Sequence, residues 1–453
     1  MLRPAFCLLL TAVLLASFTS TAVAQGNNNG GNNGGNNGNN GNNNGGVLID
    51  PEGVLQPMQV TSSLKPKRRT GSKEPLDGSV CVSLRRLNEL ISQTAPDAIP
   101  PEGFILGGLT RIDQIVVDAE ARDVILIGPG ETQVPDGGPT FIGESSGRPL
   151  MRTGDLLIML EQARSGRLFV RCSIDPEPSR LKAYNDQVRA TAGSVSFNNA
   201  AAWYQGLARI LGRQIVTVGG VPEDSRISNV LAAADYSMKR IALGVEPSGV
   251  KEIKAQLAYA AGDTGSQMKR WWFAPQYDTV AVNPDRTLFQ FSGPRVKLLA
   301  QEELILDDGR RANMDRNRPS TEAFARQFSE HFEELTAVRP IFADLKNQFD
   351  LAITASLLVR EKLLDRFDLQ LRPTPDVLQV LSPKCQTPKF VDSGANIRRV
   401  NKGTIIGVVG GVEISPSVVL GNEAPLRTAE VRTSGKPPEN LSKSQFSWRL
   451  QVP

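Results

Sequence analysis

The alternation of apolar and polar residues along the chain predicts strands and helices without a regular strand–helix repeat. In "RIDQIVVDAEARDVILIGPG" (residues 111–130), two β-rich runs flank a polar turn, which indicates a β-hairpin. Residues 167–174 and 213–218 are predicted to be single strands. The segment "TGDLLIMLEQARSG" (153–166) is typical of a short helix, with Thr153 as its N-cap and Gly166 just past its end.

Two longer segments carry apolar residues at the three- and four-residue spacing of a helix. In "SRISNVLAAADYSMKRIALG" (225–244) the apolar side chains share one face: Ile227, Val230, Leu231, Ala234, Met238 and Ile241. The second segment runs from residue 320 to about residue 365. Pro340 is expected to divide it into two helices, because proline lacks the backbone N–H donor and clashes with the preceding turn.

Two tryptophans stand side by side in "RWWFAPQYD" (270–278). The surrounding pattern predicts a strand over 271–282, a turn at "NPDR" and a second strand at "TLFQFSG" (287–293). Adjacent strand residues point to opposite faces of a sheet. We therefore expect one of Trp271 and Trp272 to enter the core and the other to lie on the far face, so that they form no common aromatic platform.

Together these elements predict an α+β fold, in which antiparallel hairpins pack against helices within residues 81–370. Prolines become frequent after residue 371, and residues 371–453 are expected to form short strands and loops that end in a disordered tail. The similar segments "GGVLIDP" (45–51) and "GGVEISP" (410–416) are expected to be edge strands near the two ends of the folded region.

The N-terminal sequence predicts export. Residues 1–24 combine Arg3, a short apolar run and the small-residue pattern "AVA", as in a signal peptide cleaved before Gln25. The apolar run is too short to span a bilayer, and no later run predicts a transmembrane segment. Residues 25–46 form a Gly/Asn spacer that has no apolar surface to bury, and 47–80 a flexible basic linker. The mature protein is expected in the periplasm, outside the cell or at its surface.

Composition excludes several classes of function. The net charge of +4 is too small to predict binding to nucleic acid, and the basic run at 65–73 is expected to be a solvated linker or, alternatively, a surface-adhesion patch. A single histidine rules out the two-histidine zinc motif. The segment "GVVGGV" (407–412) lacks the lysine of a phosphate-binding loop. No cofactor and no metal site is predicted.

Three cysteines follow the predicted signal peptide: Cys81, Cys172 and Cys385. Their wide spacing fits no metal-binding pattern. Export to an oxidising compartment favours one disulfide. Since Cys81 and Cys172 both lie in predicted strands, we expect that pair to form it.

A serine hydrolase that uses Ser145 and His331 is the alternative to a non-enzymatic protein. Ser145 is the central residue of "GESSG", which fits the nucleophile-elbow pattern G-x-S-x-G. An elbow needs a helix directly after the serine, whereas here Arg148 and Pro149 follow. His331 is expected on the apolar stripe of its helix, partly buried and bonded to Glu330, Glu334 or a backbone carbonyl.

Two acidic motifs have both chemical and structural interpretations. The segment "DTGS" (263–266) resembles an aspartic-protease signature, but it follows a predicted helix and a homodimer would have to supply the second carboxylate. The pairs Glu302–Glu303 and Asp307–Asp308 flank a hairpin end and lack the ligand pattern of a calcium loop. We expect solvated turn charges there.

The chain also resembles a known but uncharacterised family. The segments that carry the resemblance are "VTVGGVPEDSRISNVLAAADYSMKRIALGVEPSGVK", "RWWFAPQYD" and "GPRVKLLAQEEL", with further matches such as "GRPLMRTGDLL". Over roughly residues 80–360 it is similar to exported proteins typical of the Planctomycetes, known as a domain of unknown function. The resemblance implies that the tryptophan pair and the "ADYSMK" helix belong to a common scaffold, and it supplies no catalytic residue.

The sequence therefore favours an exported, non-enzymatic protein with a structural or binding role and an unknown partner in the cell envelope or at the surface. A pocket in which Ser145 and His331 form a hydrogen bond would favour the hydrolase instead.

Overall fold

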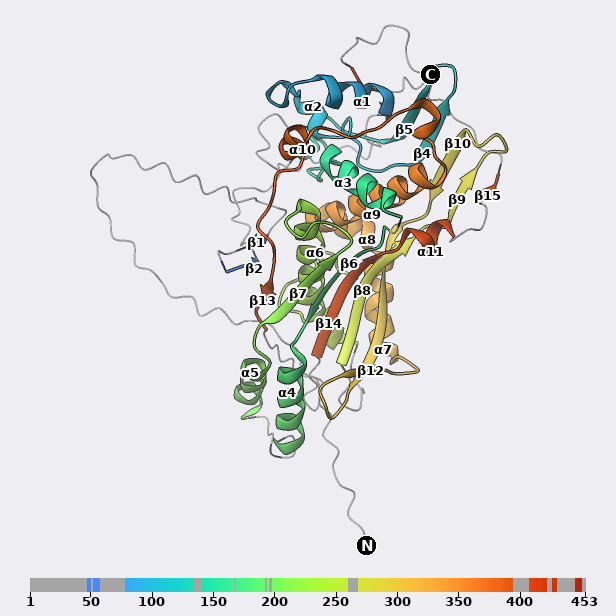
Figure 1. Ribbon diagram of the computed structural model, residues 1–453. Coiled ribbons are helices and arrows are strands. Elements are labelled where there is room, and N and C mark those ends of the chain that lie inside the picture. Colours follow the sequence, from blue (N-terminus) through green and yellow to red (C-terminus); the bar gives the residue numbers. More distant parts are fainter. Residues whose placement is uncertain are drawn as a thin grey trace, which may run out of the picture.

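A computed structural model describes most of the chain after residue 77 (Figure 1). The predicted signal peptide, the Gly/Asn spacer, much of the basic linker and the "DTGS" segment lie outside the described residues. These are 47–49, 52–57, 78–133, 141–166, 168–191, 194, 198–259, 268–393, 407–421, 426–429 and 445–449.

The larger of two mixed β-sheets has nine strands and provides the frame for the candidate site. Most neighbouring strands are antiparallel, but β13 pairs parallel with β2, and β14 pairs parallel with β8. Its strands in spatial order are β1 (Val47–Ile49), β2 (Val54–Pro57), β13 (Phe390–Val391), β7 (Gln214–Gly219), β6 (Val170–Asp175), β14 (Gly407–Ile414), β8 (Met268–Gln276), β11 (Arg295–Ile305) and β12 (Arg311–Asn313).

The second sheet has seven strands and contains the predicted 111–130 hairpin as β4 and β5. All its strand pairs are antiparallel except β15 with β9. The spatial order is β15 (Arg427–Thr428), β9 (Thr279–Val282), β10 (Leu288–Ser292), β4 (Gln114–Asp118), β5 (Asp123–Pro129), β3 (Ser79–Ser83) and β16 (Ser447–Arg449).

Helices fill the space between and beside the sheets, which confirms the predicted α+β class (Figure 1). Helices α6, α7 and α9 pack against one face of the nine-stranded sheet, and α3 packs along α9. The α-helices are α1 (Leu84–Gln93), α2 (Pro101–Phe104), α3 (Thr153–Arg164), α4 (Pro178–Thr191), α5 (Ala200–Leu211), α6 (Arg226–Ala242), α7 (Pro319–Glu330), α8 (Phe332–Val338), α9 (Pro340–Arg360), α10 (Pro375–Leu381) and α11 (Pro416–Leu420).

A buried ion-pair cluster joins three of these helices. The guanidinium of Arg226 lies 2.8 Å from a carboxylate oxygen of Asp155 on α3 and 2.6 Å from one of Asp344 on α9. Gln348 donates a further hydrogen bond to Asp155 at 2.8 Å. The charges sit in low dielectric but have partners, which is the condition under which buried ions are tolerated. The cluster fixes how α3, α6 and α9 pack.

The predicted helices are largely confirmed. Ser225 caps α6, accepting a hydrogen bond from the backbone N–H of Ser228, and the predicted apolar face of α6 is buried. The 320–365 segment divides at Pro340 as expected. It also breaks at His331, which separates α7 from α8. His331 is therefore at a helix junction, and its predicted place on a continuous apolar stripe is wrong.

The tryptophan pair divides between the two faces of β8, as predicted. Trp271 is fully buried, its ring contacts Phe324 at 4.9 Å between centroids, and its Nε1 donates to the carbonyl oxygen of Thr321. Trp272 is half-buried on the opposite face. The predicted single strand 271–282 is wrong, because β8 ends at Gln276 and β9 belongs to the other sheet.

The C-terminal strand β14 is not at an edge, contrary to the expectation for "GGVEISP". It lies between β6 and β8 and pairs with both along most of its length. Gly411 stands opposite Trp272 on one side and Ser173 on the other. The segment is short and rich in glycine, so its sequence resembles an edge strand, but its neighbours complete the centre of the sheet.

The predicted disulfide between Cys81 and Cys172 is not formed, since both are buried free thiols, as is Cys385. Cys81 belongs to β3 of the seven-stranded sheet and packs with Ile125, Ile127 and Trp448. Cys172 belongs to β6 of the nine-stranded sheet and lies in the main core. Different sheets and different apolar clusters hold the two thiols. Burial raises the pKa of Cys81 to about 12, so the thiol is unreactive.

Candidate functional site

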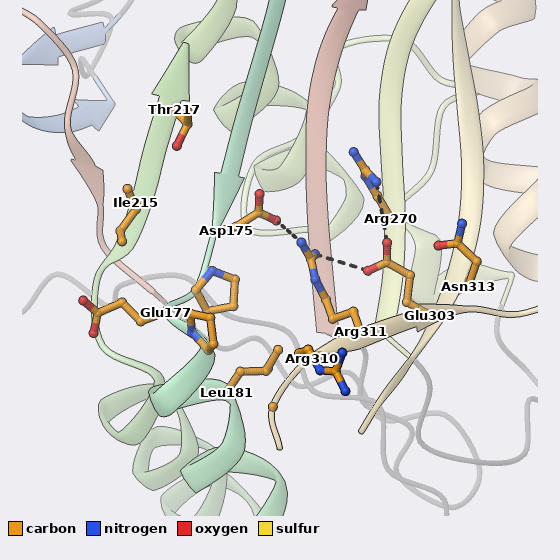
Figure 2. Close-up of a pocket in the computed structure, with 13 residues that line it drawn as sticks. Asp175, Glu177, Leu181, Ile215, Thr217, Arg270, Glu303, Arg310, Arg311 and Asn313 are labelled. Atoms are coloured by element: carbon orange, nitrogen blue, oxygen red, sulfur yellow. Dashed lines mark ion pairs between the residues drawn. The ribbon is translucent and has the colours of Figure 1, made fainter. Parts of the chain in front are cut away.

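A surface cavity of about 610 Å³ lies at one end of the nine-stranded sheet (Figure 2). That volume is within the range of small-molecule sites. Four segments distant in sequence supply its walls: the turn from β6 into α4, strand β7, strand β8 and the β11–β12 hairpin. The lining residues are Asp175, Pro176, Glu177, Pro178, Leu181, Ile215, Thr217, Arg270, Glu303, Gly309, Arg310, Arg311 and Asn313.

Close packing positions the β11–β12 hairpin against the start of α4. Gly309 has φ +85°, and a Cβ on it would stand 2.3 Å from the carbonyl oxygen of Pro178. Only glycine fits this position without displacing the backbone. The contact holds Arg310 and Arg311 at the cavity wall.

An ion-pair network crosses the cavity floor. One nitrogen of Arg311 lies 2.9 Å from Asp175, and the other lies 3.2 Å from Glu303. Arg270 reaches the second oxygen of Glu303 at 3.6 Å. Glu303 is 4% exposed, whereas Arg270 is 37% exposed, so the carboxylate is at the bottom and the guanidinium of Arg270 at the rim. Figure 2 shows Arg311 between the two carboxylates.

Two buried atoms of this network form no hydrogen bond. Glu303 Oε2 and Arg311 Nη1 face each other at the 3.2 Å of their ion pair, but their geometry does not make a hydrogen bond. Loss of solvent, opposed by Arg311 and Arg270, raises the pKa of Glu303 above its ordinary value. The two atoms are shielded from solvent and held by their ion pair, so they form a fixed, charged floor beneath the cavity.

An aromatic ring continues the polar surface beyond the cavity. The guanidinium carbon of Arg270 lies 5.3 Å from the ring centroid of Trp272, within the range of a cation–π contact. Both side chains are on the face of β8 opposite to the core. Sequence reasoning placed one tryptophan on this face but did not identify Arg270 or Glu303 as site residues.

The structure places Ser145 in a turn, with no helix directly after it. Residues 143–147 lie between the isolated bridges Gln133↔Gly143 and Ile142↔Pro149, and α3 begins only at Thr153. The backbone N–H groups of Ser145 and Ser146 donate to the buried carboxylate of Glu131 at 3.0 and 2.8 Å. Glu131 thus accounts for the shape of this turn, which lacks the strand–serine–helix geometry of an elbow.

His331 bonds to Glu334, one of the partners predicted from the sequence, with 2.9 Å between Nδ1 and Oε1. Its side chain is 24% exposed. Among the described residues, no hydrogen bond joins His331 and Ser145, although Arg148 contacts Glu333 at 3.7 Å and brings the two segments near each other. The hydrolase stays an untested alternative, and no contact between its two residues supports it.

The prediction of solvated charges is confirmed for one acidic pair and wrong for the other. Asp307 and Asp308 are exposed at the β11–β12 turn. Glu302 and Glu303 are buried on opposite faces of β11. Glu302 accepts from the hydroxyl of Thr321 at 2.5 Å and lies 3.5 Å from Arg318, so it is structural, whereas Glu303 faces the cavity.

Comparisons with known proteins agree in part with the resemblance found in the sequence. Residues 172–255 match the model of a family described as a protein of unknown function (DUF1598). No curated protein and no solved structure matches the chain. The matched residues include β6, β7 and α6, and they supply Asp175, Glu177 and Thr217 to the cavity.

The length and composition of the helices bear on whether the chain can cross a membrane. None of those in the described part of the chain combines the length and the apolar character that spanning a bilayer requires.

Proposed function

We propose that the protein is an exported, non-enzymatic binding protein that holds a saccharide of the cell envelope in the cavity between β7 and the β11–β12 hairpin. The observation that carries the proposal is the cavity of about 610 Å³, lined by charged side chains, with the partly exposed guanidinium of Arg270 beside the ring of Trp272. A polar cavity of this size next to an aromatic ring suits a polar small molecule.

The ligand class follows from the exposed groups of the lining. Arg270 supplies donors and Glu177 supplies acceptors, so a ligand has to accept from one and donate to the other. Neighbouring hydroxyls of a saccharide do both. Arg270 and Trp272 extend the surface with a planar cation and an aromatic ring, against which a sugar ring can pack. Asn313, the cross-strand neighbour of Glu303, adds an amide on the same side of the cavity.

Binding is favoured over catalysis by the way the acids are held. Arg311 lies between Asp175 and Glu303, and it forms an ion pair with each. Both carboxylates are therefore engaged in fixing one guanidinium, which suits a rigid recognition surface. The predicted signal peptide supports export, and the Gly/Asn spacer would hold the folded part away from a surface or a partner.

The test is saccharide binding by the full mature chain. We expect an array of envelope polysaccharides and soluble peptidoglycan fragments to give a ligand, whose affinity is then measured by calorimetry. Glu303→Gln and Arg311→Gln should each weaken that affinity by about tenfold or more, since each removes a charged hydrogen-bonding group. Arg189→Ala is the matched control, because Arg189 forms an exposed ion pair with Asp307 and does not line the cavity.

Two results would contradict the proposal. One is equal affinity in Glu303→Gln and wild type, which would place the ligand elsewhere. The other is no saccharide bound by a folded protein. Export is tested separately, by mass spectrometry of the mature protein from cell fractions, with Gln25 expected as the first residue.

A further inference from the structure

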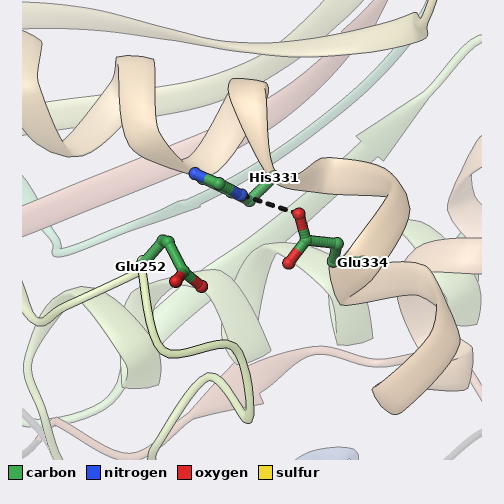
Figure 3. Close-up of side chains that lie close together, drawn as sticks. All are labelled: Glu252, His331 and Glu334. Carbon is green, nitrogen blue, oxygen red and sulfur yellow. Dashed lines mark hydrogen bonds and ion pairs between the residues drawn. The ribbon is translucent and has the colours of Figure 1, made fainter.

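A second cluster of polar side chains gathers around the only histidine of the chain (Figure 3). Glu252, His331 and Glu334 each offer one ligand atom, and these atoms lie within 4.8 Å of one another. Figure 3 shows both carboxylates facing the imidazole ring. None of the three residues lines the cavity described above.

The helix junction fixes two of the three side chains. His331 ends α7 and precedes α8, with its backbone N–H bonded to the carbonyl of Gln327 and its own carbonyl accepting from Leu335. Glu334 is in the first turn of α8, three residues after His331. Side chains three apart on a helix are neighbours, so the imidazole and the carboxylate meet.

The loop that carries Glu252 is tied to the same helix. Ser248 is buried, and its hydroxyl bridges the loop to the carbonyl oxygens of Val250 and Ile253. Arg339, directly after α8, donates to the carbonyl oxygen of Ser248 at 2.9 Å and also forms an ion pair with Glu246. The loop is thus held against the end of α8, and Glu252 approaches His331 from a fixed backbone.

The two carboxylates of the cluster give it a negative charge that a bound cation would balance. Among the described residues, neither Glu252 nor Glu334 forms an ion pair with a lysine or an arginine. The carboxylate of Glu252 has no hydrogen-bond partner there, and that of Glu334 has only His331. Two carboxylates this close repel each other unless a positive charge lies between them.

We propose that Glu252, His331 and Glu334 bind a first-row divalent metal ion of the zinc class. One imidazole nitrogen and two carboxylate oxygens are ligands that Zn²⁺ accepts, and three protein ligands leave a coordination position open. The oxygen-only preference of Mg²⁺ and Ca²⁺ makes them the weaker candidates. The ion links the loop after α6 to the α7–α8 junction, so it stabilises the folded state by binding there.

Because the chain has a single histidine, metal binding can be followed at that side chain without a variant. In untagged mature protein, the imidazole signal in an NMR spectrum belongs to His331 alone. Addition of one equivalent of Zn²⁺ is expected to shift or broaden that signal and to raise Tm, because a ligand bound only by the folded state stabilises it. An imidazole signal that does not respond to Zn²⁺ overturns the proposal, and this measurement needs no variant.

Variants then identify the carboxylate ligands. Glu252→Gln and Glu334→Gln should each lower the Zn²⁺ affinity, measured by equilibrium dialysis, by about tenfold or more. Glu330→Gln is the matched control, since Glu330 is exposed, is one residue from His331 and bonds to Gln327. Equal retention of Zn²⁺ by all three variants would mean that the ion binds elsewhere, and the proposal would fail.

Discussion

The two faces of the nine-stranded sheet carry the same kinds of residue but have different roles: one packs into the core, and the other forms an open polar surface. On the inner face, Trp271 is buried among the phenylalanines of α7, and its indole nitrogen has a partner. On the outer face, Trp272 is half-buried beneath Arg270, whose side chain also lines a cavity with an ion-pair network at its floor. Adjacent residues thus serve cohesion on one side and an open surface on the other.

The difference teaches that residue type alone does not separate scaffold from site. Arginines and carboxylates occur on both sides of the sheet. Around Arg226 the carboxylates of Asp155 and Asp344 are fully engaged by direct hydrogen bonds. Around Arg311 the network borders a cavity, and the side chains of Arg311 and Arg270 are 25% and 37% exposed. Exposure to a cavity, rather than the presence of charge, marks the outer face for binding.

The largest expected effect comes from truncating each tryptophan in turn. Trp271→Ala should lower the free energy of unfolding by about 3–5 kcal/mol, because it leaves a cavity in the core. Trp272→Ala removes a ring that is only half-buried and should cost much less, about 1 kcal/mol. Urea unfolding of the two variants measures the difference. Similar losses for both would contradict the assignment of the faces.

A smaller effect is expected from the buried acid of the inner face. Loss of solvent raises the pKa of Asp235 from its ordinary value of 3.8 to about 6, although Lys239 lies 3.4 Å away. Because the pKa of Asp235 is higher in the folded than in the unfolded protein, its protonated form stabilises the fold at low pH. This stabilisation of about 3 kcal/mol is complete below pH 3.8 and is lost as pH rises through about 6.

Asp235→Asn cannot ionise and should remove this pH dependence. Between about pH 4 and pH 7 the free energy of unfolding of wild type should fall by about 3 kcal/mol more than that of the variant. Denaturant titrations at several pH values give the free energy of unfolding of both proteins as a function of pH. The same pH dependence in wild type and variant would show that Asp235 ionises normally in the fold.

The smallest effect on stability is expected at the cavity. Burial raises the pKa of Glu303, so the fold holds its charged form less favourably than the unfolded chain does, even with Arg311 and Arg270 nearby. Glu303→Gln removes this buried charge, so the free energy of unfolding at neutral pH should be unchanged or higher. Arg189→Ala, at an exposed ion pair, should change it by less than about 0.5 kcal/mol. A large decrease in the free energy of unfolding of Glu303→Gln would mean that Glu303 is needed for the stability of the fold.

The sequence predicted those elements that are determined by residues close to one another along the chain. The Ser225 cap and the apolar spacing of α6, the 111–130 hairpin and the opposite faces of Trp271 and Trp272 all follow from short-range rules. The break at His331 was missed because residues 320–338 keep their helical periodicity through it. The change of sheet after Gln276 was missed because the apolar pattern continues from β8 into β9.

The cavity and the His331 cluster depend on contacts between residues distant in sequence, and local sequence patterns do not predict such contacts. Glu303 looks like a turn acid in "EELILDDGRR", and only the approach of Asp175 and Arg270 makes it part of a cavity. The proximity of His331 and Glu334 follows from helical spacing. Glu252, by contrast, is brought to them by tertiary packing, so the cluster was not predicted.

The central position of β14 has a consequence for how the chain is made. Residues 407–414 leave the ribosome after every other strand of their sheet, yet they join β6 to β8. Until then those two strands present bare edges, which are prone to pairing with other chains. A nascent chain therefore cannot close its larger sheet before residues 407–414 have been made, and until then it stays incompletely folded, as passage through an export channel requires.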